Sequence, residues 1–122
     1  IANKKGEITC AAEIPQGSEI RLMLGDREKA IKAAKEAAVE ALNQLKKTKP
    51  KVIFVFNCIA RYKLLGSRIG DEIAAVQKVL GKDIPLIGFY TYGELAPLGG
   101  KLGPECFSVF HNETMALVVL GD

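Results

Sequence analysis

The chain has 122 residues, of which 48% are hydrophobic and 25% charged, and its formal net charge is +3 at pH 7. This length suits one domain around a single core, and this composition excludes disordered proteins, while no apolar run, residues 52–56 among them, is nearly long enough to span a membrane. Nucleic-acid binding is not expected, because the lysines lie among glutamates and form no basic block with interleaved aromatic residues.

The cysteines bear on the compartment and on metal binding. Cys10, Cys58 and Cys106 are odd in number and far apart, which is typical of a reducing compartment and gives no disulfide framework. With one histidine and no CxxC pair, a structural zinc site is not expected. We therefore predict a cytoplasmic protein and interpret residues 1–122 as one domain, cut from a longer protein because no signal peptide or initial methionine is visible.

The amino-terminal part predicts a hairpin followed by a helix. Residues 7–13 and 19–24 are partly apolar and are separated by turn-forming residues 14–18, which favours two antiparallel strands. Asp26 is then a suitable N-cap for a long amphipathic helix that ends before Pro50. The buried stripe of this helix is predicted to be Ile31, Ala34, Ala38, Ala41, Leu42 and Leu45.

Residues 51–57 are apolar without alternation, which predicts a central strand covered on both faces. A second helix follows, irregular near residues 66–67 and then regular up to Gly81. The remaining elements are a strand at residues 86–94, a glycine- and proline-rich loop at 95–104 that is long enough to cover a site, and a hairpin made by residues 105–110 and 114–120.

These elements predict an α/β fold of α+β type. The expected order is β-β-α-β-α-β-β-β, with a mixed sheet of about six strands and two long helices. Strands that are linked by a helix are expected to be parallel, with right-handed connections.

The strand at residues 86–94 carries the most informative pattern. Alternation places Tyr90, Tyr92 and Glu94 on the same side as Gly88, and a glycine inside a strand often marks a place where a ligand or another backbone comes close. Gly93, between the strand and a carboxylate, is expected to have a positive φ. We interpret this side as the polar wall of a binding site; alternatively, the two tyrosines are half-buried aromatics on a solvated sheet face.

A second candidate region lies where the central strand becomes the second helix. Asn57, Cys58 and Arg61 are there at the carboxyl edge of the sheet, where open α/β sheets bind ligands. The helix amides and the Arg61 guanidinium suit an anionic group. The alternative is that Arg61 pairs with Glu94 or a surface acid and only stabilises the fold.

The run GFYTYGELAP, with Cys58-Ile-Ala-Arg61 before it and Phe110-His-Asn-Glu-Thr114 after it, resembles the signature of the FIST C-terminal domain. This family is an intracellular sensory module of signal-transduction proteins. The resemblance implies a non-catalytic domain that needs no cofactor and binds a small, amino-acid-like ligand. It also implies partners, namely the FIST N-terminal domain and a signalling output domain or protein.

We therefore predict a ligand site around one cleft, in which Arg61 and Glu94 would clamp the two ends of a zwitterion. Its predicted residues are Asn57, Cys58, Arg61, Tyr90, Tyr92, Gly93, Glu94, His111 and Asn112.

The roles of two residues stay open. His111 is a turn residue, a member of the same pocket, or a haem ligand, since some FIST proteins are regarded as haem-based gas sensors. Cys58 is either an inert buried thiol or the nucleophile of a thiol enzyme, because a helix N-terminus lowers the pKa of a thiol. The sequence identifies neither the ligand nor the output partner nor the oligomeric state.

Overall fold

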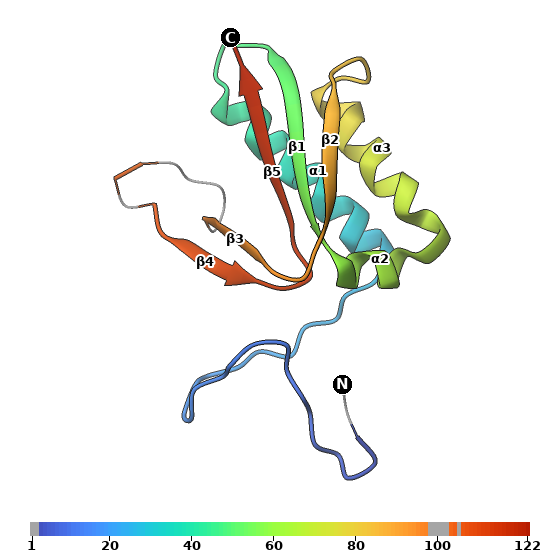
Figure 1. Ribbon diagram of the computed structural model, residues 1–122, viewed down its shortest axis with the longest axis vertical. Helices are drawn as coiled ribbons and strands as arrows, with labels where there is room; N and C mark the ends of the chain where they lie inside the picture. The colour runs from blue at the N-terminus through green and yellow to red at the C-terminus, as the bar shows by residue number, and fades with distance from the viewer. Residues whose placement is uncertain (1–2, 98–102, 105) are drawn as a thin grey trace.

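The computed structural model describes residues 3–97, 103–104 and 106–122, and a three-stranded sheet forms its centre (Figure 1). The middle strand is β1 (Pro50–Cys58), between β2 (Leu86–Thr91) and β5 (Met115–Gly121). β2 runs parallel to β1 and β5 antiparallel to it. The predicted mixed sheet and the parallel pairing of the helix-linked strands are therefore confirmed.

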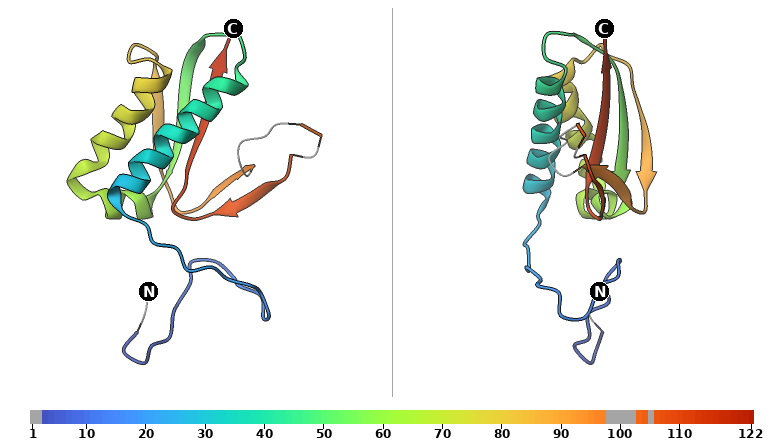
Figure 2. Two further views of the ribbon diagram at one scale, coloured as in Figure 1. Left: turned by 180° about the vertical axis from the view of Figure 1, so that it is seen from behind. Right: turned by 90° about the vertical axis from the view of Figure 1, so that its left-hand side faces the viewer.

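Two helices cover one face of this sheet. α1 (Arg27–Gln44) and α3 (Ile69–Leu80) pack against each other, and Figure 2 shows both on the same side of the strands. Between β1 and α3 lie the short α2 (Ile59–Leu65) and a 3-10 turn, η1 (Gly66–Arg68), which confirms the predicted irregularity. The core between helices and sheet consists of Ala34, Ala38, Ile53, Val55, Val76, Leu80 and Met115.

α1 begins where the sequence predicts. The carboxylate of Asp26 accepts a hydrogen bond from the backbone N–H of Lys29 at 2.8 Å, which satisfies one of the free amides of the first turn. Ala30, Ala34 and Ala38 are buried at intervals of four residues, and these small side chains allow close packing against the sheet and α3. No helix among the described residues is both long and apolar enough to cross a membrane.

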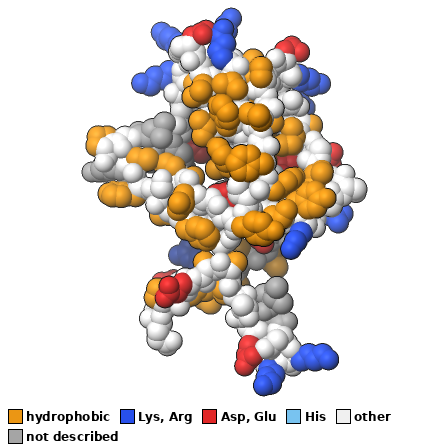
Figure 3. Space-filling view, in the orientation of Figure 1, with side chains coloured by type: hydrophobic (Ala, Val, Ile, Leu, Met, Phe, Trp, Pro, Cys, Tyr) orange, Lys and Arg blue, Asp and Glu red, His pale blue; other side chains and the backbone are white. Residues whose placement is uncertain are grey.

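The opposite face of the sheet has no helix on it in the described part of the chain. We call this surface the open face; it is formed by Phe54, Phe56, Ile87, Phe89, Val118 and Leu120. Figure 3 shows hydrophobic side chains gathered across the strands. The prediction that the central strand is covered on both faces is wrong, because α1 and α3 lie on the same side.

The predicted amino-terminal hairpin is not formed. Residues 3–26 hold a single bridge position at Ile8 and no strand, and Figure 1 shows this segment projecting from the body of the molecule. An isolated two-stranded hairpin is marginal in water, and here its apolar side chains contact no core. The described residues therefore contain five strands, and not the six predicted.

The predicted strand at residues 86–94 is divided by a bend at Tyr92 and Gly93. After the bend, β3 (Glu94–Pro97) pairs antiparallel with β4 (Ser108–His111) in a separate two-stranded sheet. The predicted carboxyl-terminal hairpin is therefore wrong, because β4 pairs with β3 whereas β5 pairs with β1. Pairing with β1 lets the apolar β5 pack against α1, which a hairpin with β4 would not provide.

Part of the carboxyl-terminal region lies outside the described residues. Residues 98–102 of the predicted covering loop belong to it, as does Glu105, the first residue of the strand predicted at 105–110. The predicted covering role of this loop stays a prediction.

Candidate functional site

β1 ends at Asn57 and Cys58, where the chain turns into α2. Cys58 is the N-cap of α2, with φ −65° and ψ 135°, and its amide donates to the carbonyl of Thr114 at 3.0 Å. Its side chain makes no capping hydrogen bond and the residue is 2% exposed. This arrangement fixes the start of α2 against the start of β5. It places Arg61, in the first turn of α2, on the side of the sheet that α1 and α3 cover.

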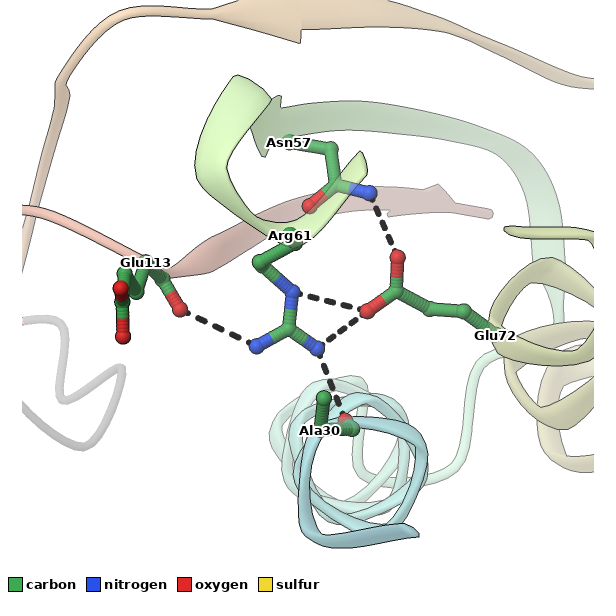
Figure 4. A network of polar contacts seen from close by, with 5 residues as sticks. All are labelled: Ala30, Asn57, Arg61, Glu72 and Glu113. Atoms are coloured by element: carbon green, nitrogen blue, oxygen red, sulfur yellow. Dashed lines mark hydrogen bonds and ion pairs between the residues drawn. The ribbon is translucent and has the colours of Figure 1, made fainter. Parts of the chain in front are cut away.

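The buried guanidinium of Arg61 holds groups from three other parts of the chain (Figure 4). Its Nε donates to Oε1 of Glu72 at 2.7 Å, and Nη2 contacts the same oxygen in a buried ion pair. Nη2 also donates to the carbonyl of Ala30 at 2.8 Å, and Nη1 to that of Glu113 at 3.1 Å. The alternative in which Arg61 pairs with Glu94 or a surface acid is wrong as to the partner, because the buried Glu72 takes that place.

Glu72 is the central residue that the sequence interpretation missed. It is 0% exposed, and its Oε2 accepts a hydrogen bond from Nδ2 of Asn57 at 2.6 Å. A signal was present, since Glu72 lies three residues after Ile69 and four before Val76, on the buried stripe of its helix. An acid on such a stripe is almost always paired, and Arg61 is the buried cation available.

The burial of this ion pair determines its role. Removing two charges from water costs several kcal/mol per ion, and only good geometry with additional hydrogen bonds offsets that cost. Here both carboxylate oxygens of Glu72 and all three guanidinium nitrogens of Arg61 have partners. A ligand carboxylate would have to displace one of them, so the geometry favours a positioning role for Arg61.

Tyr90 stands beside this network on the helix-covered face of the sheet. It is paired with Asn57 in the β1–β2 register, and its ring meets that of Tyr62 edge to face at 5.1 Å. Burial raises the pKa of Tyr90, and the negative charge of Glu72 raises it further. Asn57 and Tyr90 also line a hollow of about 390 Å³ that follows β2.

Glu94 belongs to a second group of residues. It is 3% exposed, and its Oε1 contacts the hydroxyl of Thr91, which also lies 3.2 Å from the carbonyl of Asn57. Its other oxygen, Oε2, is buried without a hydrogen-bond partner among the described residues. Oδ1 of Asn57 is also buried without a hydrogen-bond partner among the described residues.

The two groups approach the sheet from different sides. The register directs Asn57 and Tyr90 to the covered face and Thr91, the next residue, to the open face. The network of Arg61 reaches the side chain of Asn57, whereas Glu94 reaches that of Thr91. The bend before β3 interrupts the alternation on which the single cleft was predicted, and Tyr92 at this bend is 86% exposed. Ligand binding by these residues stays a prediction.

Both glycines of this stretch are explained by close neighbours. Gly93 is not among the glycines with a positive φ, so that prediction is wrong. A Cβ at Gly93 would instead collide with the ring of Phe110 from β4. A Cβ at Gly88 would collide with the carbonyl of Val55, so the close approach expected there comes from the neighbouring strand.

His111 lies opposite Glu94 in the β3–β4 register and is half-buried. Its Nε2 is 3.1 Å from the carbonyl of Ala96, within its own small sheet. Asn112 follows in the exposed turn, where its carbonyl accepts a hydrogen bond from Thr114 at 3.1 Å. Ligation of haem iron through Nε2 would require this contact to break, and haem binding by His111 stays a prediction.

The described residues do not give Cys58 the contacts of a catalytic nucleophile. Its thiol is buried, and the described residues give it no hydrogen bond to a base. The ring of His111 is bonded to the backbone of β3. Nucleophilic catalysis by a thiol requires a contact between thiol and base that is not formed in this part of the structure.

The chain matches one known protein family over most of its length. The family model described as FIST C domain matches residues 1–97, from the amino-terminal segment through β3. The resemblance found in the sequence motifs is thereby confirmed, and the family is one of sensory domains in signal-transduction proteins. No curated protein and no solved structure matches the chain.

Proposed function

We propose that this chain, which belongs to the FIST C domain family, senses a small amine-bearing ligand of amino-acid type. We assign the ammonium of the ligand to Glu94, and the exposed ring of Tyr92, two residues earlier, to the rest of the ligand. Binding involves no reaction. Occupancy changes the contacts of the domain with its partners, for which the FIST N-terminal domain and an output domain or protein remain our candidates.

The observation that carries this proposal is the unpaired oxygen of Glu94. Buried polar atoms are normally hydrogen-bonded, and an ionised carboxylate accepts at both oxygens. The hydroxyl of Thr91 donates a hydrogen bond to Oε1 of Glu94, while Oε2 has no partner among the described residues. An ammonium offers three N–H donors and a positive charge, which together meet the need of Oε2 and leave a donor for a second acceptor.

Arg61 has a different role in this proposal from the one the sequence suggested. Its donors are engaged with Glu72 and with the carbonyls of Ala30 and Glu113. We propose that Arg61 positions the turn from β4 to β5, and through it the strand pair that carries Glu94. Recognition then depends on the amine end of the ligand, and a free carboxylate is not required.

Isothermal titration calorimetry with three sets of compounds tests this assignment: free amino acids, their primary amides and their N-acetyl derivatives. Amides retain the ammonium and should bind as the free amino acids do. N-acetyl derivatives lack it and should bind at least about 30-fold more weakly, which corresponds to about 2 kcal/mol for leaving a buried charge unpaired. Equal affinity of free and N-acetylated compounds would contradict the proposal.

The variant Glu94→Gln provides the matching test on the protein. It removes the charge with little change of shape, so binding of amines should weaken by a similar factor. Glu113→Gln is the matched control, because it makes the same change on an exposed side chain of the adjacent turn. The backbone carbonyl of residue 113 still accepts its hydrogen bond from Arg61 in this variant. Unchanged affinity in Glu94→Gln would assign the amine to another group.

A further inference from the structure

The outer edge of β2 is a feature that the proposed ligand site does not use. β2 has β1 as its neighbour, and no other described strand pairs with it. The amide of Ile53 donates to the carbonyl of Pro85, which sets the direction of every later backbone group in this parallel pair. The N–H and C=O groups that point away from β1 are those of Leu86, Gly88 and Tyr90. They have no strand partner among the described residues.

The hollow of about 390 Å³ runs along this edge. On the helix side it is lined by Ile73 of α3 and by Val55 and Asn57 of β1, and its lining includes Gly88, which has no side chain to block an approaching backbone. Ile87 and Phe89 line it from the open face. This form suits an added strand, because its backbone would pair with the edge and its alternate side chains would fill the two sides.

The chain itself contains a segment of matching form at residues 19–24. Ile20, Leu22 and Leu24 alternate with Arg21 and Met23, and no proline interrupts the run. Leu22 and Leu24 are each 88% exposed. The segment has as many residues as β2, and Figure 1 shows it in the part of the chain that projects away from the body. Burying such exposed apolar side chains against another surface is favourable, because it removes them from water.

We propose that residues 19–24 of one copy add as a strand to the β2 edge of a second copy. Because each copy carries both the projecting segment and the free edge, the exchange is reciprocal and produces a symmetric dimer. In this dimer the outward backbone groups of Leu86, Gly88 and Tyr90 are paired, and alternate side chains of the segment lie beside Ile73.

Sedimentation equilibrium of the intact chain tests the association. A monomer–dimer equilibrium is expected, and Leu22→Asp should raise its dissociation constant at least about tenfold by placing a charge in the interface. Ile14→Asp is the matched control, since it makes the same kind of change at an exposed residue outside residues 19–24, and it should leave the constant unchanged. A monomer at all concentrations, or equal effects of both variants, would overturn the proposal.

Hydrogen exchange tests the place of association. The amides of Gly88 and Tyr90 should exchange at least about tenfold more slowly in the dimer than in Leu22→Asp, because they gain partners. The amide of Phe89 faces β1 in both states and should not change. Circular dichroism is the control, and it should show that the variant is folded. A dimer in which Gly88 and Tyr90 exchange as fast as in the variant would place the interface elsewhere and overturn the proposal.

Discussion

The two glycines of residues 86–94 show how a residue type can be recognised from the sequence while its cause is not. Gly88 was expected near a ligand or another backbone, and the neighbour is the carbonyl of Val55. Gly93 was expected to have a positive φ, but its φ is not positive, and the ring of Phe110 lies where a Cβ would be. The sequence interval between Gly93 and Phe110 gives no hint of this contact, which depends on the pairing of β3 with β4.

The contact predicts a specific coupling between Gly93 and Phe110. Gly93→Val should lower the free energy of unfolding by about 1–3 kcal/mol, because the added side chain overpacks the bend. The double variant Gly93→Val with Phe110→Ala should lose less than the sum of the two single losses, since the smaller residue removes the collision. Urea denaturation of the four proteins measures the coupling. Strictly additive losses would show that the ring does not limit the bend.

The positions of the helices and of the central strand could be predicted, because local sequence patterns determine them. The Asp26 cap, the helix end before Gly81 and the apolar run of β1 are short-range signals, and each lies in the element that it predicted. The pairing of β4 with β3 and of β5 with β1 could not be predicted, because competing strand partners differ in tertiary burial and not in local pattern.

The candidate site divides in the same way. Asn57 and Arg61 were identified from their position at the end of a strand, and both are buried and bonded there. Their common partner, Glu72, lies on another helix and was missed. For Glu94, burial was not predicted, since a carboxylate after a glycine is ordinarily exposed.

The Arg61 network connects α1, α2, α3, β1 and the turn before β5, so breaking it should affect stability throughout. Arg61→Met should cost about 3–5 kcal/mol of unfolding free energy, because Glu72 is left as a buried unpaired charge. Arg61→Met with Glu72→Leu should recover a large part of that loss, because both charges are removed.

Equilibrium urea unfolding measures these differences. Arg68→Met is the control: it removes two ion pairs at the surface, with Glu28 and with Asp71, and its effect should be much smaller. A double variant as unstable as Arg61→Met would show that the hydrogen bonds to Ala30 and Glu113, and not the uncompensated charge, dominate the loss.

At the scale of the whole molecule, the fold is a two-layer structure with one sheet face covered and the other exposed (Figures 1 and 2). Monomeric proteins rarely expose contiguous apolar patches of more than a few hundred Å². The open face carries Ile87 and Phe89 at 62% and 63% exposure, beside Val118 and Leu120. The covered face therefore holds the buried core, whereas the open face leaves much of its apolar surface exposed in the single chain.

This division predicts that the open face can be made polar without unfolding the domain. Val118→Lys with Leu120→Lys should change the free energy of unfolding by less than about 1 kcal/mol, because both side chains, on β5 and away from the β2 edge, are about half exposed in the native state. The same change should strongly reduce the fluorescence of the dye ANS, which binds exposed apolar surface. Val39→Lys, on the solvent side of α1 and 41% exposed, is the control and should leave the fluorescence unchanged. A large loss of stability in the double lysine variant would mean that the open face is packed in solution, and unchanged dye binding would place the apolar surface elsewhere.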